Sequence, residues 1–138
     1  MPNGRKLIMI GASGHGRVCA DIAELMGYTD IVFLDDAPHI TSCAGYPVVG
    51  SVSEANNLEG DLFIAIGNAQ VRRRITEANS GRVIATLIHP SAVVARSASV
   101  GAGSVLMAGA VINPGVTLGR GVIINTCASV DHDSTVCD

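Results

Sequence analysis

The chain has 138 residues and a formal net charge of −3, and 48% of its residues are apolar against 15% charged, which excludes a disordered, charge-rich chain. The negative charge and the dispersed arginines argue against an electrostatic nucleic-acid binder, and the longest apolar runs, such as residues 7–10, are far too short to span a bilayer. Since the N-terminus also lacks a convincing secretory signal, we expect a soluble, cytoplasmic protein.

The first half of the chain alternates strand and helix patterns. A β-favouring run at residues 6–10 ends at Gly11, and apolar residues at helical spacing predict a helix over residues 17–26. Further strands are predicted at 31–34, 46–49 and 62–66, and further helices at 51–58 and 69–78. A doubly wound nucleotide-binding sheet begins with a strand, a glycine turn, a helix and a second strand that ends in acidic residues. We therefore predict an α/β, Rossmann-like subdomain over residues 1–84.

The glycine turn after the first strand has the sequence GASGHG, residues 11–16. Backbone N–H groups in such a turn can approach an anion, and the helix N-terminus adds a favourable field. Asp35 follows Gly14 by about 20 residues, the usual offset for an acid that binds a ribose hydroxyl. The G-x-x-G-x-G spacing differs from the G-x-G-x-x-G of NAD sites, so it favours a nucleotide or nucleotide sugar and opposes an NAD-linked oxidoreductase. The alternatives are a purely structural turn and, for His15, a residue that only starts the helix.

The second half of the chain repeats every six residues. Aliphatic residues recur at this spacing at Ile88, Val94, Val100, Leu106, Ile112, Leu118, Ile124, Val130 and Val136. A helix needs a period near 3.6 and a strand a period of 2, so a sustained period of six predicts a triangular solenoid over residues 85–138. The aliphatic residue points inward, and the small residue four positions later fits the tight corner. This core needs few aromatic residues, in keeping with two Phe and no Trp.

The solenoid stops inside a repeat, at residues 136–138. An uncovered solenoid end exposes apolar surface and unpaired strand edges. We therefore expect that the solenoid is incomplete at its C-terminus, either because the chain is truncated or because a partner covers the end.

Five stretches of the chain resemble bacterial hexapeptide-repeat sugar acetyltransferases, of the sialic acid O-acetyltransferase and UDP-4-amino-sugar N-acetyltransferase branch. They are GASGHG (11–16), FLDD (33–36), FIAIGN (63–68), HPSA (89–92) and INTCASVDHD (124–133). The resemblance implies a Rossmann-like subdomain followed by a left-handed parallel β-helix, assembled as a homotrimer. It also implies transfer of acetyl from acetyl-CoA, the co-substrate, to a sugar amine or hydroxyl.

By this resemblance, His132 matches the catalytic histidine of the family. A neutral imidazole is the usual base near pH 7, and an adjacent acid fixes its tautomer. Asp133 follows His132, and we expect it to orient the ring, although Asp131 precedes it. The alternative for His132 is an exposed turn residue. His89, at the start of the solenoid, is expected to be structural.

The resemblance also implies a nucleotide-sugar site in the first subdomain. Phosphate or sugar contacts fall on Gly14, His15 and Gly16, nucleoside contacts on Asp35 and Asp36, and a second wall of the site on Gly67 and Asn68. Arg72 either reaches a phosphate or belongs, with its two arginine neighbours, to a solvated helix face.

These patterns together predict an acetyltransferase that acts on the amine of a nucleotide-linked amino sugar in bacterial surface glycan biosynthesis, with His132 as general base. One alternative is a sialic acid O-acetyltransferase, which needs no nucleotide site. Another is a non-catalytic nucleotide-sugar-binding or assembly module. The four cysteines show no CxxC pair and no metal-finger spacing, so we expect reduced thiols and no metal site.

Overall fold

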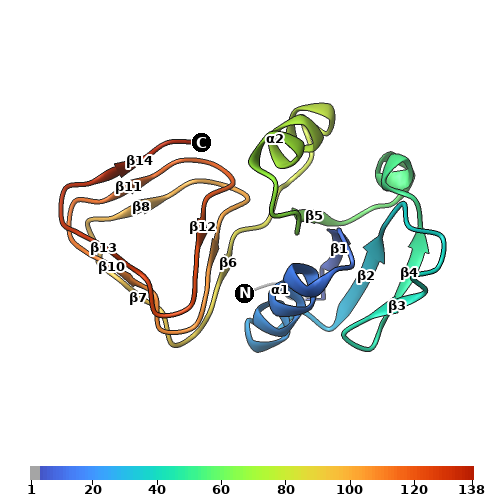
Figure 1. Ribbon diagram of the computed structural model, residues 1–138, viewed down its shortest axis with the longest axis horizontal. Helices are drawn as coiled ribbons and strands as arrows, with labels where there is room; N and C mark the ends of the chain where they lie inside the picture. Colours follow the sequence, from blue (N-terminus) through green and yellow to red (C-terminus); the bar gives the residue numbers. More distant parts are fainter. Residues whose placement is uncertain (1–3) are drawn as a thin grey trace. The chain divides into compact units, whose positions relative to one another are not determined.

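The computed structural model describes residues 4–138, which form two compact units that divide between Ala85 and Thr86. The first unit is an α/β sheet and the second is a solenoid of short parallel strands (Figure 1). Both parts of the predicted fold class, the Rossmann-like subdomain and the left-handed parallel β-helix, are confirmed.

The sheet of the first unit has the strand order β3-β4-β2-β1-β5. Its strands are β1 (Lys6–Ile10), β2 (Asp30–Leu34), β3 (Ser42–Cys43), β4 (Tyr46–Gly50) and β5 (Asp61–Ile64). All neighbours run parallel except β3, which pairs antiparallel with β4. The sequence did not predict β3, because two residues are too few to show a period. The central strand β1 is buried from Leu7 to Ile10, as its continuous apolar run indicates.

The helix α1 (Gly14–Leu25) connects β1 to β2, and the 3-10 helix η1 (Val52–Asn57) connects β4 to β5. The helix α2 (Ala69–Ala78) follows β5, the last strand of the sheet. The structure places α2 where the sequence predicted it. In contrast, α1 begins three residues earlier than expected, because the carbonyl oxygen of Ser13 already accepts the N–H of Arg17 at 3.0 Å. Gly14, His15 and Gly16 therefore lie in the first turn of the helix and not in the preceding loop.

Within residues 86–138, nine two-residue strands form three parallel sheets around a triangular core (Figure 1). The sheets contain β6 (Leu87–Ile88), β9 (Val105–Leu106) and β12 (Ile123–Ile124); β7 (Val93–Val94), β10 (Val111–Ile112) and β13 (Ser129–Val130); and β8 (Ser99–Val100), β11 (Thr117–Leu118) and β14 (Thr135–Val136). Each strand pairs with the strand 18 residues away, for example Ile112 with Val130 and Val94. One coil of the solenoid is therefore three hexapeptides.

The predicted aliphatic positions all lie in or against one hydrophobic cluster inside the solenoid. The residue four positions later also packs inward, as Ala110 and Val116 show, so it contributes to the core as well as fitting the corner. The residue three positions after the aliphatic one, just before the second inward position, takes a left-handed backbone conformation in most turns. These residues are Gly103, Gly109, Gly115, Gly121, Cys127 and Asp133.

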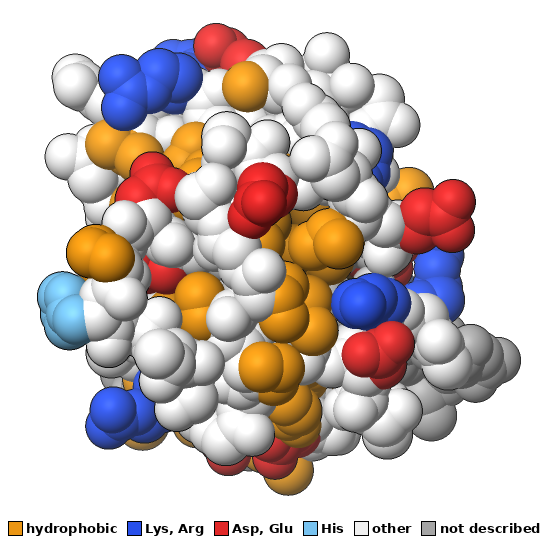
Figure 2. Space-filling view, turned by 90° about the vertical axis from the view of Figure 1, so that its right-hand side faces the viewer, with side chains coloured by type: hydrophobic (Ala, Val, Ile, Leu, Met, Phe, Trp, Pro, Cys, Tyr) orange, Lys and Arg blue, Asp and Glu red, His pale blue; other side chains and the backbone are white. Residues whose placement is uncertain are grey.

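The charged side chains and the thiols of residues 4–138 are distributed as follows. No helix in this part of the chain combines the length and the apolar character that a bilayer crossing needs. The four cysteines are free thiols, two of them buried and two exposed. On the face shown in Figure 2, basic side chains are scattered among acidic ones around a band of hydrophobic side chains.

Candidate functional site

The predicted ligand residues of the first unit follow three neighbouring strands. Residues 14–16 come after β1, residues 35–36 after β2, and residues 67–68 after β5. Since β2, β1 and β5 are adjacent and parallel, these residues meet at the carboxyl edge of the sheet. Ligands of open α/β sheets bind at this edge.

The glycines of this edge have different structural roles. A Cβ at Gly16 would overlap with the carbonyl oxygen of Gly11, and it would lie 3.2 Å from the Phe33 ring. Gly16 therefore lets α1 pack closely against the loop and the sheet. A Cβ at Gly14 or at Gly67 would meet no atom within 4 Å, so these two glycines border open space.

The two acids after β2 accept hydrogen bonds from the backbone. Asp35 accepts the N–H of Ala12 on Oδ2 and the N–H of Ala37 on Oδ1, both at 2.8 Å. Asp36 is exposed and accepts the N–H of Val52 at 2.9 Å. Asp35 thus ties the loop after β1 to the end of β2, a role that its sequence position did not indicate.

His15 is half-buried in the first turn of α1. Its Nε2 lies 3.6 Å from the Sγ of Cys19, one helical turn further on. Burial lowers the pKa of His15, and the positive charge of Arg72 lowers it further. Burial also raises the pKa of the Cys19 thiol to about 12. His15 is therefore held as a neutral imidazole beside a protonated thiol.

Arg72 and Asn68 shape the loop after β5. Arg72 donates from Nη1 to the carbonyl oxygens of Ile66 at 3.0 Å and of Gly67 at 2.9 Å. Asn68 caps α2, since its Oδ1 accepts the N–H of Val71 at 3.0 Å. Arg72 is half-buried whereas the next two arginines are exposed, so the three residues do not form a uniform solvated face. In the sequence, Arg72 follows the Gly67-Asn68 pair after β5 by about one helical turn. This spacing was the signal that indicates its contact with the loop.

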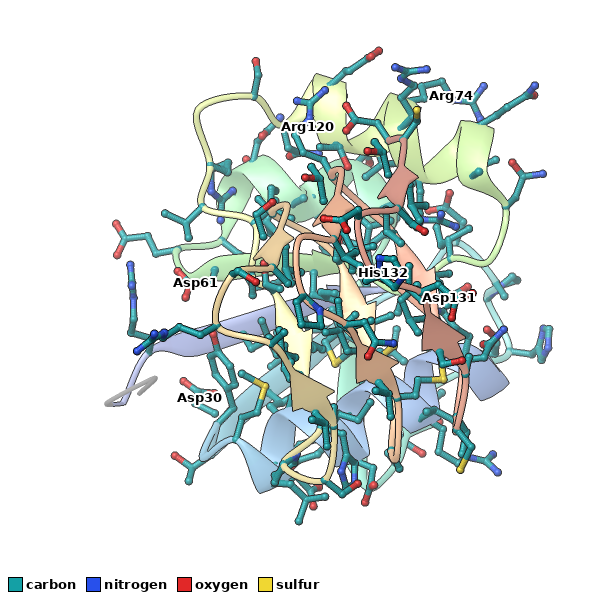
Figure 3. The ribbon with its side chains drawn as sticks, turned by 90° about the vertical axis from the view of Figure 1, so that its left-hand side faces the viewer. Asp30, Asp61, Arg74, Arg120, Asp131 and His132 are labelled. Atoms are coloured by element: carbon teal, nitrogen blue, oxygen red, sulfur yellow. The ribbon has the colours of Figure 1, made fainter. Side chains whose placement is uncertain are left out.

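The second unit presents His132 and Asp133 in the turn between β13 and β14. Figure 3 labels His132 and Asp131, which project from this turn. The Nδ1 of His132 lies 2.9 Å from Oδ2 of Asp133, and 79% of each of these two side chains is exposed. The pairing that we expected from the sequence is therefore present as a hydrogen bond.

This hydrogen bond determines the chemistry available to His132. The bond to Asp133 and the negative charge of Asp133 raise the pKa of His132, and Asp131 raises it further. In the neutral ring, Nδ1 carries the proton that it donates to the carboxylate, which leaves the lone pair on Nε2. The pair can accept a proton from a nucleophile at Nε2 and stabilise the resulting imidazolium.

Replacement of Asp133 by asparagine should lower the pKa of His132, because it removes the charge that favours the imidazolium. Only the neutral ring accepts a proton, so any activity that uses His132 should rise with pH through this pKa, and in Asp133→Asn that rise should occur at lower pH. An NMR titration of His132 measures the change. Asp131→Asn is the control and should give a smaller decrease, and an unchanged midpoint in Asp133→Asn would contradict the assignment.

The described residues, 4–138, contain no group of three or more His, Cys, Asp or Glu side chains arranged to hold a metal ion.

Comparisons with known proteins identify a common family. A family profile described as the PglD N-terminal domain matches residues 6–78. The chain is 34% identical over 110 residues to UDP-N-acetylbacillosamine N-acetyltransferase of Bacillus subtilis (strain 168), an alignment that covers 74% of the chain and 51% of that protein. The chain thus spans about half the length of this curated relative.

Solved structures with the same fold match nearly the whole length of this chain. The acetyltransferase domain of PglB from Neisseria gonorrhoeae FA1090, in complex with acetyl coenzyme A, is 46% identical with a TM-score of 0.92, and the match covers 97% of this chain and 68% of that one. PerB from Caulobacter crescentus, in complex with CoA and GDP-perosamine, is 34% identical with a TM-score of 0.85. That match covers 94% of this chain and 64% of the PerB chain.

Proposed function

The chain belongs to the family of the PglD N-terminal domain, and from this premise we propose that it acts as an acetyl-CoA-dependent acetyltransferase on the amine of a nucleotide-linked amino sugar. The reaction would serve bacterial surface glycan biosynthesis, in the cytoplasm. The relatives support the substrate class, because one is named for a UDP-linked sugar and two were solved with CoA or acetyl-CoA. The structural observation that carries the proposal is the hydrogen-bonded pair of His132 and Asp133.

In the proposed reaction, the sugar amine attacks the carbonyl carbon of the acetyl thioester. A C–N bond forms, the C–S bond breaks, and CoA leaves as a thiol. His132 takes the amine proton at Nε2 and returns it to the departing sulfur. Asp133 holds the ring through Nδ1 and stabilises the positive charge while the proton is on the ring.

The nucleotide portion of the substrate would bind at the carboxyl edge of the sheet in the first unit. The N–H groups of the first turn of α1, at residues 14–16, suit a phosphate. His15 is a neutral hydrogen-bonding group near that turn, and exposed Asp36 is assigned to the ribose. Asp35 would act mainly by shaping the loop, and Gly67 borders the open side of the site.

We also propose that the protein assembles as a homotrimer through its solenoid. The outward positions of the sheet β13-β10-β7 include two valines, of which Val93 is 60% exposed and Val111 is half-buried. The outward positions of the sheet β14-β11-β8 are Ser99, Thr117 and Thr135. The apolar sheet face is the better candidate for contact with a second copy.

Release of CoA thiol tests the proposed reaction. The complete protein should release thiol from acetyl-CoA when a nucleotide-linked amino sugar is present and not when free sialic acid is supplied. Cys127 and Cys137 are exposed free thiols that a thiol reagent can reach, so the signal without sugar must be subtracted. Calorimetric titration with UDP, GDP and CMP sugars measures binding separately.

The other outcomes of this assay identify the competing functions. Thiol release with free sialic acid would indicate sialic acid O-acetylation. Binding of nucleotide sugars without thiol release, under any donor and acceptor combination, would indicate a non-catalytic binding module. Either result would overturn the proposal.

A further inference from the structure

The backbone of Asp133 has a conformation that is uncommon for residues other than glycine. Its φ is +59°, in the left-handed region, where four earlier repeats of the solenoid carry glycine. Asp is one of the few side-chain-bearing residues that adopt this conformation at modest cost. The turn one coil below fixes it there, since the N–H of Asp133 donates to the carbonyl oxygen of Pro114 at 3.0 Å.

Gly115 lies directly beneath Asp133 in that lower turn. The φ of Gly115 is +75°, and its N–H donates to the Oγ of Ser97 at 3.0 Å. Gly115 is therefore held in place by a residue of the next lower coil. A Cβ added to Gly115 would overlap with Oδ1 of Asp133. The carboxylate therefore occupies the space that a side chain at position 115 would fill.

We propose that Gly115 is a positioning residue for the pair of His132 and Asp133. Because Gly115 has no side chain, the carboxylate of Asp133 settles against its Cα, and from there Oδ2 reaches Nδ1 of His132. Any side chain at 115 displaces the carboxylate and weakens that hydrogen bond. This inference rests on the proposed role of His132 as base, which it deepens by naming a residue that acts through Asp133.

The chain contains a matched control at Gly109. Gly109 occupies the same turn position as Gly115 in the preceding repeat, with a φ of +70°. A Cβ there would lie 2.9 Å from the Sγ of Cys127, which has the same φ as Asp133. Alanine at either glycine thus imposes similar backbone strain, but only alanine at 115 meets the carboxylate of Asp133.

An NMR titration of His132 provides the first test, using wild type, Gly115→Ala, Gly109→Ala and Asp133→Asn. The charges that face His132 are those of Asp133 and Asp131. We expect Gly115→Ala to move the midpoint of His132 down toward that of Asp133→Asn, and Gly109→Ala to leave it at the wild-type value. A folded Gly115→Ala protein with the wild-type midpoint would overturn the proposal.

A double variant tests whether the effect passes through Asp133. If it does, Gly115→Ala combined with Asp133→Asn should titrate as Asp133→Asn alone. Further lowering of the midpoint in the double variant would contradict an action through the carboxylate.

A second pair of variants decides the question if Gly115→Ala does not fold. Combining it with Asp133→Gly should restore folding, since this removes the overlapping side chain. Combining it with Cys127→Gly should not restore folding. Failure of Asp133→Gly to rescue the fold would overturn the proposal.

Catalysis gives a readout that is separate from the titration. In the thiol-release assay, Gly115→Ala should lower kcat and shift the acid limb of the pH profile, with KM for the nucleotide sugar unchanged. The titration needs no substrate, so it can fail while His132 remains essential for turnover. Conversely, a protein without transferase activity can still show the expected midpoints, so failures of the two proposals are distinguishable.

Discussion

Replacement of His132 by alanine is expected to lower acetyl transfer by about 10²–10⁴-fold, the usual contribution of a general base. The amine must lose its proton as it attacks, and alanine removes the Nε2 that accepts it. His132 lies in the second unit, whereas the proposed nucleotide contacts lie in the first, so binding of the nucleotide sugar should persist. Thiol release measures the rate, and calorimetry measures the affinity.

His89→Ala is the control for this experiment. His89 is half-buried at the start of the solenoid, where its Nδ1 accepts the N–H of Ser91 at 3.0 Å, a local turn contact. Its replacement removes an imidazole from the same solenoid and should leave the transfer rate near that of wild type. Retention of most of the activity in His132→Ala would refute its role as base.

Gly16→Ala is expected to destabilise the first unit by about 1–3 kcal/mol, the usual cost of forcing an extra methyl group into a packed region. The added Cβ would overlap with the carbonyl oxygen of Gly11, which is backbone and has no alternative rotamer. Within residues 4–138 both α-helices belong to this unit, so urea unfolding followed by helical circular dichroism reports its stability.

Gly14→Ala provides the comparison. The two glycines lie in the same helical turn, but a Cβ at Gly14 would meet no atom within 4 Å, so the free energy of unfolding should change by less than in Gly16→Ala. Alanine has a higher helix propensity than glycine, so propensity alone would not destabilise either variant. Equal losses in the two variants would therefore contradict the close contact with Gly11 as the cause.

The comparison of Gly16 with Gly14 also distinguishes a glycine needed for packing from a glycine that is free to contact a ligand. The sequence assigned residues 14–16 jointly to phosphate or sugar, because a glycine-rich turn suggests close backbone approach to a ligand. The structure distinguishes them, since Gly16 faces the Gly11 carbonyl and Gly14 borders open space. A glycine pattern alone cannot tell whether its lack of a side chain accommodates a ligand or another part of the chain.

The architecture of the protein was determined largely by its sequence. A repeat of six residues indicates a parallel β-helix, and every aliphatic residue of that repeat lies in or against the solenoid core. The helix over residues 69–78 and the buried strands β1, β2 and β5 also follow from local patterns. These features depend on period and hydrophobicity, which short stretches of sequence display.

Tertiary structure decided how individual side chains are used. The carboxylate of Asp35 binds the N–H of Ala12, 23 residues earlier in the chain, and Arg72 affects the pKa of His15 from another helix. Gly115 meets Asp133 only because one coil of the solenoid is 18 residues long. Hydrogen bonds and steric contacts act over a few ångströms between residues distant in sequence, so the fold had to bring them together before their roles could be assigned.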